Sequence, residues 1–203
     1  KFIPSYPTKT WPNHYTIMTG LYPVSNGIVA NKFYDPPSKR MFYYADPATV
    51  RDPYFYQGRP FWSQVNAAGM KSACTQFPTC DVPCNGETPT YVKEYDPTVP
   101  NYVRVQNILS WVDMTADKQP SFIAAYMSDV DDVAHIFGPN NVHTMQALRE
   151  LDENMGTLYD ALKSRQRRFD IDLIIVSDHG FLPIEGKIFI DDFINVSEFL
   201  IPE

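Results

Sequence analysis

Short apolar runs alternate with segments of helical periodicity along this chain. Residues 122–127 and 173–176 are apolar runs with the length of strands buried on both faces of a sheet. Between them, apolar residues recur three and four positions apart from residue 142 to residue 162. This spacing predicts an amphipathic helix with one apolar face, capped by Asn140 or Asn141. The alternation of strands and helices favours an α/β sheet.

The first part of the chain contains shorter elements. Pro12 suits the first turn of a helix and Gly20 its end, which predicts a helix over residues 12–19. Residues 33–58 are rich in Tyr, Phe, Pro and Asp and lack a helical period, so we expect loops with short strands there. The pattern further predicts helices at 59–68 and 101–114, a strand at 71–75 and a loop at 78–90.

The composition is that of a globular protein. The 203 residues suffice for one sizeable core, and 44% hydrophobic and 20% charged residues are ordinary values. A net charge of −7 argues against general binding to the nucleic-acid backbone. It leaves room for a small phosphorylated substrate, because bound metal ions can override the local charge. No apolar run approaches the length of a membrane span, and the start at Lys1 suggests a piece of a longer protein.

Three cysteines, Cys74, Cys80 and Cys84, lie close together in a loop that contains Pro and Gly. Reduced thiols are one alternative, and a zinc ribbon is disfavoured because no second Cys pair follows. We expect one local disulfide, with the third Cys paired outside the chain, and therefore an oxidising compartment. The triplet at 195–197 is a glycosylation sequon. Both features predict an extracellular location, the lumen of the secretory pathway or the ectodomain of a membrane-anchored protein.

Acidic and imidazole side chains follow both apolar runs. Asp131 and His135 come after the first run, four positions apart and hence on one face of a helical turn. Asp178 and His179 come directly after the second run. Since functional groups collect beyond the carboxyl ends of strands in open α/β sheets, we expect these four side chains to meet. Mixed carboxylate and imidazole ligation suits zinc, with iron or manganese as alternatives, and the grouping predicts a dinuclear metal site.

Other polar residues near these clusters have simpler interpretations. Asp129 and Asp132 suit solvated or helix-capping positions, and His143 suits the start of the amphipathic helix. His14 suits packing or hydrogen bonding beside a nucleophile better than it suits metal ligation. Taken alone, Thr10 would be a helix cap, and Asn31 would be a turn residue.

Three motifs together carry a family resemblance. They are residues 7–31, which contain Thr-Lys-Thr-Trp-Pro-Asn-His-Tyr, residues 129–139, which end in Gly-Pro, and Ser-Asp-His-Gly at 177–180. In this order and at these separations they resemble the nucleotide pyrophosphatase/phosphodiesterases, a branch of the alkaline phosphatase superfamily. Within the second motif, Ala134 stands where the family usually has Gly, and residues 129–130 replace Glu-Pro.

The resemblance implies an alkaline-phosphatase-like fold, a mostly parallel sheet flanked by helices. Residues 1–203 would form part of a single phosphodiesterase catalytic domain. In the family, an aspartate on an earlier strand and a histidine on a later segment complete the metal site, and both fall outside this chain. The positions inside the chain that match the family's metal ligands are Asp131, His135, Asp178 and His179.

By the same resemblance, two Zn²⁺ ions, or other divalent metals, bind to these four residues and to Thr10. Thr10 attacks phosphorus and forms a phosphothreonine intermediate, and Asn31 donates to a phosphoryl oxygen in the transition state. Trp11 stands where the family usually has a Phe that packs on a nucleobase, although a core role would also suit it. Tyr91, or else Tyr95, would supply the opposing ring.

Three functions follow as hypotheses. The first is a two-metal phosphodiesterase or nucleotide pyrophosphatase that hydrolyses phosphodiester or pyrophosphate bonds of nucleotides. The second is a phospholipid or choline-phosphate phosphodiesterase on the same scaffold. The third is a catalytically inactive extracellular domain with a structural or interaction role. The expected ligand is a small phosphorylated molecule, and the sequence predicts no particular protein partner.

Overall fold

The central sheet is parallel, and in the described part of the chain it has three strands. The structure, a computed structural model, describes residues 2–84, 86–165 and 170–195. The strands, in the order β4-β3-β5, are β3 (Ser72–Thr75), β4 (Tyr91–Lys93) and β5 (Phe122–Ala125). β3 pairs in parallel with both neighbours, and all of its residues are buried. The strands predicted at 71–75 and 122–127 are therefore confirmed.

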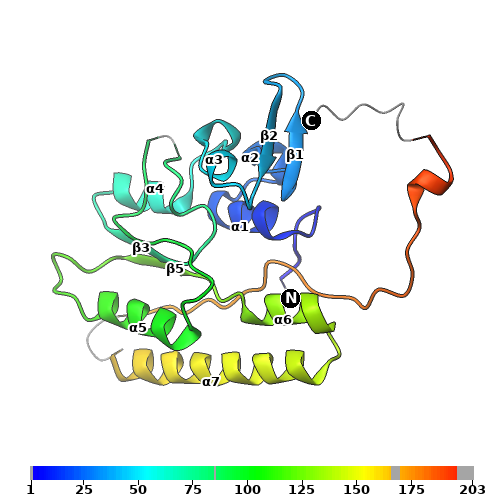
Figure 1. Cartoon of the computed structure of the whole chain (residues 1–203). Helices are drawn as coiled ribbons and strands as arrows, with labels where there is room; N and C mark the ends of the chain where they lie inside the picture. Colours follow the sequence, from blue (N-terminus) through cyan, green and yellow to red (C-terminus); the bar gives the residue numbers. More distant parts are fainter. Residues whose placement is uncertain (1, 85, 166–169, 196–203) are drawn as a thin grey trace.

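Helices lie on both sides of this sheet (Figure 1). On one side are α1 (Thr10–Thr19) and α4 (Phe61–Ala67), and on the other is α5 (Asn101–Val112). α6 (Asp129–Phe137) follows β5, and α7 (Val142–Arg165) forms an outer layer beneath α5 and α6. The layers place the start of α6 at the carboxyl end of β5, where the sequence predicts a functional site.

α1 carries the N-terminal motif. It begins at Thr10, earlier than the predicted range 12–19, so Thr10 is the first residue of the helix. Gly20 ends the helix with a φ of 70°, a conformation that glycine adopts without strain. Lys9 occupies the N-cap position without a side-chain cap hydrogen bond. The side-chain NH₂ group of Asn13 donates to the Lys9 carbonyl oxygen at 3.0 Å.

The segment between α1 and α4 forms an aromatic layer. Its elements are α2 (Pro23–Asn26), β1 (Lys32–Asp35), β2 (Arg40–Tyr43), α3 (Pro47–Val50) and the 3-10 helix η1 (Pro53–Phe55). β1 and β2 pair as an antiparallel hairpin, which confirms the expected short strands among loops. We call the buried core of this layer the aromatic cluster; it consists of Tyr15, Ile28, Phe42, Phe55, Tyr56, Val82 and Cys84.

The predicted amphipathic helix is α7, but only part of its apolar face is buried. Leu158 and Leu162 pack in one cluster with residues of α5 and β5. Val142 and Met145 lie on the predicted apolar face, yet they stay 69% and 42% exposed. The reason is that α5 covers the C-terminal half of α7, whereas the N-terminal half lies beneath the shorter α6 (Figure 1). The predicted amphipathic helix is therefore confirmed, and its apolar face is buried in the C-terminal half only.

The second apolar run does not form the predicted strand. Residues 173–176 have no regular secondary structure, and Ile174 and Ile175 are 81% and 64% exposed. A strand needs a neighbouring backbone to complete its hydrogen bonds, and within the described residues no strand pairs with this run. The run still passes beside β5, so the residues that follow it reach the carboxyl end of the sheet (Figure 1).

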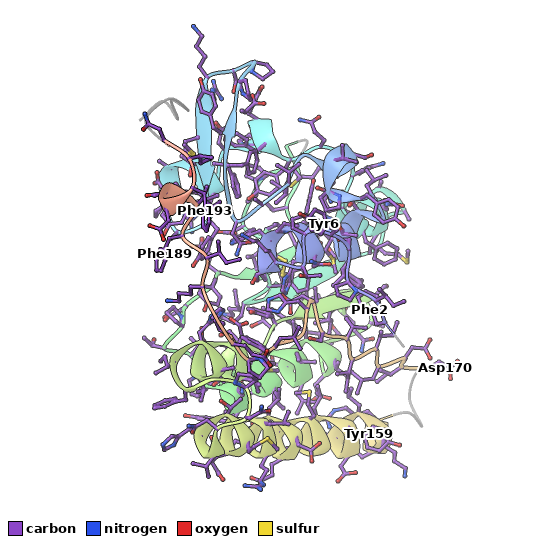
Figure 2. All side chains as sticks on the ribbon, turned by 90° about the vertical axis from the view of Figure 1, so that its right-hand side faces the viewer. Phe2, Tyr6, Tyr159, Asp170, Phe189 and Phe193 are labelled. Atoms are coloured by element: carbon purple, nitrogen blue, oxygen red, sulfur yellow. A yellow bond between two sulfur atoms is a disulfide. The ribbon has the colours of Figure 1, made fainter. Side chains whose placement is uncertain are left out.

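The last described residues extend away from the sheet. Phe189 and Phe193 are 64% and 75% exposed on this outlying segment (Figure 2). The sequon predicted at 195–197 falls largely outside the described residues, since only Asn195 belongs to them. Among the helices of the described ranges, none is long and apolar enough to cross a membrane.

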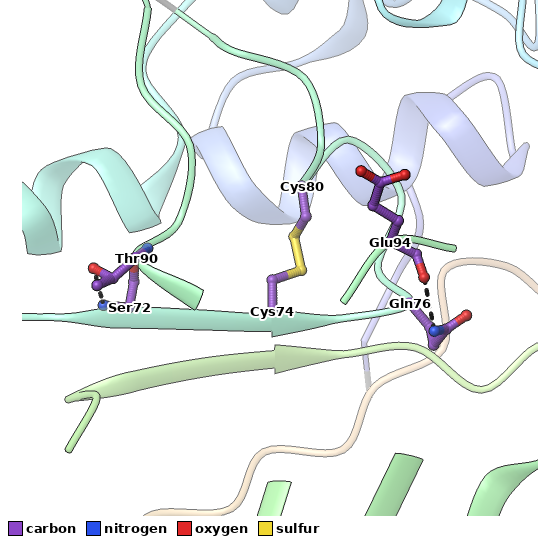
Figure 3. The surroundings of a disulfide bond; sticks show 6 residues. All are labelled: Ser72, Cys74, Gln76, Cys80, Thr90 and Glu94. Carbon is purple, nitrogen blue, oxygen red and sulfur yellow. Dashed lines mark hydrogen bonds between the residues drawn. A yellow bond between two sulfur atoms is a disulfide. The ribbon is translucent and has the colours of Figure 1, made fainter. Parts of the chain in front are cut away.

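A disulfide joins β3 to the loop that follows it (Figure 3). Its partners are Cys74 and Cys80, whose Cα atoms lie 6.3 Å apart, and both residues are buried. The expected local disulfide is confirmed. Cys84 is a free thiol inside the aromatic cluster, where the Tyr15 hydroxyl donates to its sulfur at 3.7 Å. Cys84 has no disulfide partner within the described residues, and its pairing with a Cys outside the chain stays a prediction.

Candidate functional site

Three segments bring polar side chains together at the carboxyl end of β5. They are the first turn of α1, the helix α6, and residues 177–181, which follow the extended run. The Thr10 hydroxyl oxygen lies 3.3 Å from His179 Nε2, and 169 positions of sequence separate the two residues. The N-terminal motif and the Ser-Asp-His-Gly motif therefore meet in space, even though residues 173–176 form no strand.

Two carboxylates surround the same imidazole nitrogen. His179 Nε2 lies 3.3 Å from Asp178 Oδ2 and 3.7 Å from Asp131 Oδ1. The second oxygen of Asp131 lies 3.5 Å from His135 Nε2, one turn further along α6. His135 is the most exposed of the four, with 69% of its side chain accessible. The structure thus brings together all four side chains that the sequence grouped.

Burial leaves part of this cluster without hydrogen bonds. Asp131 Oδ1 and Asp178 Oδ2 are buried atoms that no hydrogen-bond donor satisfies. Burial raises the pKa of the Asp131 carboxyl, and the nearby imidazoles of His135 and His179 act in the opposite direction. A buried carboxylate oxygen without a donor is costly unless a cation or a proton compensates it. The cluster therefore has unmet negative charge.

The cluster is not arranged as a ready metal centre. In the part of the chain that the structure describes, no group of three or more His, Cys, Asp or Glu side chains could hold a metal ion as it stands. The side chains face one another as ion pairs instead. Their chemistry nevertheless fits zinc, because ligand atoms around tetrahedral zinc lie about 3.3–3.5 Å apart. The two contacts of His179 Nε2 with Asp178 and Thr10, both 3.3 Å, are of this size.

His14 lies beneath the cluster and is a hydrogen-bonding residue, in agreement with the sequence interpretation. Its Nδ1 lies 2.8 Å from the Thr10 carbonyl oxygen and 3.4 Å from Asp178 Oδ2. The side chain is buried, and its ring meets those of Phe77 and Tyr126 edge-on. Burial lowers the pKa of His14 more than Asp178 raises it, so the imidazole is neutral near pH 7.

Asn31 and Trp11 contact each other at the start of α1. The Trp11 backbone N–H donates to Asn31 Oδ1 at 3.0 Å, so the NH₂ group of Asn31 lies on the other branch of the amide. The indole ring of Trp11 packs against Phe42 and Tyr44, with both centroid distances at 6.4 Å. Trp11 therefore packs against the aromatic cluster.

The structure does not bring Tyr91 to the cluster. Tyr91 pairs with Ala73 at the amino end of β4, and its hydroxyl donates to the Lys118 carbonyl at 2.9 Å. Tyr95, the alternative, lies beyond the carboxyl end of β4, and its hydroxyl is 3.4 Å from Ser128 Oγ at the start of α6. Tyr91 and Tyr95 are four positions apart along the chain. The pairing of β4 with β3 therefore places Tyr95, and not Tyr91, at the end of the strand that faces the site.

Two aromatic residues near the cluster had escaped the sequence interpretation. Phe181 contacts the rings of both His135 and His179, at 5.3 Å and 5.7 Å. Tyr126 contacts His14, and burial raises its pKa, with Asp178 and Asp131 adding to the effect. Position was the available signal: Phe181 directly follows the Ser-Asp-His-Gly motif, and Tyr126 ends the apolar run of β5.

Known proteins resemble the whole chain. A family model described as type I phosphodiesterase/nucleotide pyrophosphatase matches residues 1–202. A venom phosphodiesterase of Crotalus durissus collilineatus is 38% identical over 175 residues, which cover 86% of this chain and 21% of that protein. Human ectonucleotide pyrophosphatase/phosphodiesterase family member 1 is 38% identical over 177 residues, which cover 87% of this chain and 19% of the relative.

Solved structures agree with the fold. Mouse ectonucleotide pyrophosphatase/phosphodiesterase 5, in an inactive threonine-to-alanine form in complex with AMP, matches with a TM-score of 0.74 and 30% identity. The match covers 80% of this chain and 43% of that chain, which confirms an alkaline-phosphatase-like fold present as a partial domain. The chain spans about a fifth of the length of the two curated relatives. Because the family model matches almost every residue, the chain belongs to the type I phosphodiesterase/nucleotide pyrophosphatase family.

Proposed function

We propose that this chain is part of an extracellular two-zinc phosphodiesterase that hydrolyses phosphodiester or pyrophosphate bonds of nucleotides, with Thr10 as its nucleophile. The observation that carries the proposal is the contact of the Thr10 hydroxyl with His179, 3.3 Å long, beside two partly buried carboxylates. The names of the relatives, venom phosphodiesterase and ectonucleotide pyrophosphatase/phosphodiesterase, support the activity and the location.

The zinc ions would be held by the clustered side chains. Asp131 Oδ1 and Asp178 Oδ2 support this, because they are buried oxygens without hydrogen-bond donors. When bound, zinc supplies a Lewis acid that lowers the pKa of a hydroxyl and neutralises charge on a phosphoryl group. The proposed ligands inside the chain are Thr10, Asp131, His135, Asp178 and His179.

The chain's own residues account for the covalent steps. The Thr10 oxygen forms a bond to phosphorus while the bond from phosphorus to the leaving oxygen breaks, which gives a phosphothreonine ester. Water then cleaves the new bond and restores the hydroxyl. The phosphoryl group would lie at the N-terminus of α1, whose helix dipole favours an anion. The NH₂ group of Asn31 would donate to a phosphoryl oxygen, since its carbonyl oxygen already accepts from Trp11.

A nucleotide is the substrate that the surroundings of Thr10 suit best. The flat ring of Trp11 is held in place by Phe42 and Tyr44, and stacking on a base is tolerant of base identity. Tyr95 lies on the same side as the start of α6 and would supply a second ring. The AMP complex of the mouse relative supports a nucleotide ligand.

The location outside the cytosol rests on cysteine chemistry. The Cys74–Cys80 disulfide is buried, and disulfides of this kind persist in oxidising compartments. The relatives include a venom enzyme and an ectoenzyme by name. A glycan attached to Asn195 in protein isolated from its natural source would support the same location.

The test uses the full-length protein and the p-nitrophenyl ester of thymidine 5′-monophosphate. We expect Thr10→Ala to lower kcat by at least about a thousandfold, while Thr10→Ser keeps a hydroxyl and retains measurable turnover. Unchanged turnover in Thr10→Ala would refute the nucleophile. Preference for p-nitrophenylphosphorylcholine would favour the phospholipid alternative, and a protein without bound metal or turnover would be a non-enzymatic domain.

A further inference from the structure

The first turn of α1 lacks an ordinary N-terminal cap, although it carries Thr10. Lys9 at the N-cap position makes no side-chain cap hydrogen bond. Asn31 and His14, the latter from α1 itself, support the turn instead. Asn31 accepts the Trp11 N–H at 3.0 Å, and His14 Nδ1 lies 2.8 Å from the Thr10 carbonyl oxygen. The backbone of Thr10 is thus held from both sides by side-chain contacts.

His14 also connects α1 to the segment of the Ser-Asp-His-Gly motif. The same Nδ1 that meets the Thr10 carbonyl lies 3.4 Å from Asp178 Oδ2. Both neighbours are oxygen acceptors, so Nδ1 carries the hydrogen and acts as the donor. One nitrogen therefore faces the main chain of the proposed nucleophile and the side chain of a proposed metal ligand.

The imidazole has little freedom to leave this position. Its side chain is 4% exposed. The Phe77 ring meets it at 4.8 Å and the Tyr126 ring at 4.6 Å, both edge-on. Phe77 stands in the loop that the Cys74–Cys80 disulfide closes, and Tyr126 directly follows β5, so both rings come from constrained segments. The sheet thereby sets the place of His14, and His14 sets the place of the Thr10 carbonyl.

We propose that His14 is a positioning residue, which fixes the first turn of α1 against Asp178 so that the Thr10 hydroxyl points into the cluster. The proposal rests on the proposed function of Thr10. The imidazole touches neither phosphorus nor the leaving group, and it acts through the backbone of the nucleophile. A small displacement of a reacting group is sufficient to lower a rate by about a hundredfold.

Two substitutions separate positioning from packing. His14→Phe keeps a ring between Phe77 and Tyr126 but removes the donor, whereas His14→Asn places an amide N–H near the position of Nδ1. In the full-length protein we expect His14→Phe to lower kcat for the p-nitrophenyl nucleotide ester by about tenfold to a hundredfold, with KM changed less than about threefold. His14→Asn should recover most of that kcat.

The matched control is His143→Phe, the same change at an exposed position at the start of α7. It should leave kcat and KM unchanged. Melting temperatures of both His14 variants should lie within a few degrees of each other. If kcat of His14→Phe equals that of the unmodified protein, or if both His14 variants lose kcat equally, the positioning role is refuted.

A second measurement does not depend on turnover. Crystal structures of the unmodified protein, His14→Phe and His14→Asn would show whether the Thr10 hydroxyl moves relative to His179 and Asp178. We expect a displacement of about 1 Å or more in His14→Phe and none in His14→Asn. If the Thr10 hydroxyl of His14→Phe has not moved, the inference is overturned, whatever turnover the protein shows. A moved hydroxyl in a protein without Thr10-dependent turnover would support the inference and refute the proposed function alone.

Discussion

The Thr10 hydroxyl oxygen lies 3.3 Å from His179 Nε2, although the two residues are 169 positions apart in the chain. The same imidazole nitrogen is 3.7 Å from Asp131 on α6. These two contacts of one imidazole nitrogen therefore join the start of α1, the start of α6 and the segment after the second apolar run. Each of these three segments carries one motif of the family, so the two contacts link all three motifs.

The buried carboxylates should decide how much metal the protein holds. We expect Asp131→Asn and Asp178→Asn each to weaken zinc binding by at least about tenfold, since each removes a charge from an oxygen that has no hydrogen-bond donor. Elemental analysis of the dialysed full-length protein measures this loss without reference to activity. Asp152→Asn on the exposed side of α7 is the control and should retain its zinc. Full zinc content in both cluster variants would rule out these ligands.

The two candidate tyrosines should differ in their effect on substrate binding. Tyr95 lies beside Ser128 at the start of α6, whereas Tyr91 bonds the Lys118 carbonyl at the other end of β4. Because stacking on a base contributes about 1–3 kcal/mol, Tyr95→Ala should raise KM for a nucleotide ester by about fivefold or more. Tyr91→Ala should change it by less than about twofold. Equal effects of the two substitutions would contradict this geometry.

The free thiol of Cys84 should resist modification in the folded protein. Burial raises its pKa from 9.0 to about 11, so the reactive thiolate is scarce at pH 8. Labelling with 5,5′-dithiobis(2-nitrobenzoate) should be slow in the native protein and fast in urea. Rapid stoichiometric labelling of the native protein would show that the thiol is accessible after all.

The same shift predicts how stability depends on pH. The thiol of Cys84 has a pKa of 9.0 in the unfolded chain and of about 11 in the folded protein, so the folded state holds the proton more tightly. This contribution to the free energy of unfolding is complete below pH 9. That contribution disappears as the pH rises through about 11. The urea midpoint should therefore fall more steeply between pH 9 and 11 for the unmodified protein than for Cys84→Ala. Parallel curves would contradict the raised pKa.

Local patterns predicted much of the fold because local physics decides it. Gly20 adopts the positive φ that ends α1, and residues 122–125 of the first apolar run form the strand β5. The grouping of Asp131, His135, Asp178 and His179 followed from motif positions beyond apolar runs. Such features depend on the nearest residues along the chain or on a general rule of α/β sheets.

Features that depend on distant neighbours could not be predicted in this way. Residues 173–176 have the composition of a buried strand, but no described backbone pairs with them. Val142 stays exposed because α6, rather than α5, lies over its end of α7. The choice between Tyr91 and Tyr95 depended on the register of β4 against β3, which apolar periodicity does not reveal.

The stereochemistry of hydrolysis at phosphorus tests the proposed covalent step most directly. Transfer through Thr10 displaces groups at phosphorus twice, so the configuration is retained, whereas direct attack by water inverts it. The measurement is the hydrolysis, by the full-length protein, of one diastereomer of a nucleotide phosphorothioate ester in ¹⁸O-labelled water. The account predicts net retention of configuration. Net inversion would contradict a phosphothreonine intermediate and with it the assignment of Thr10 as the nucleophile.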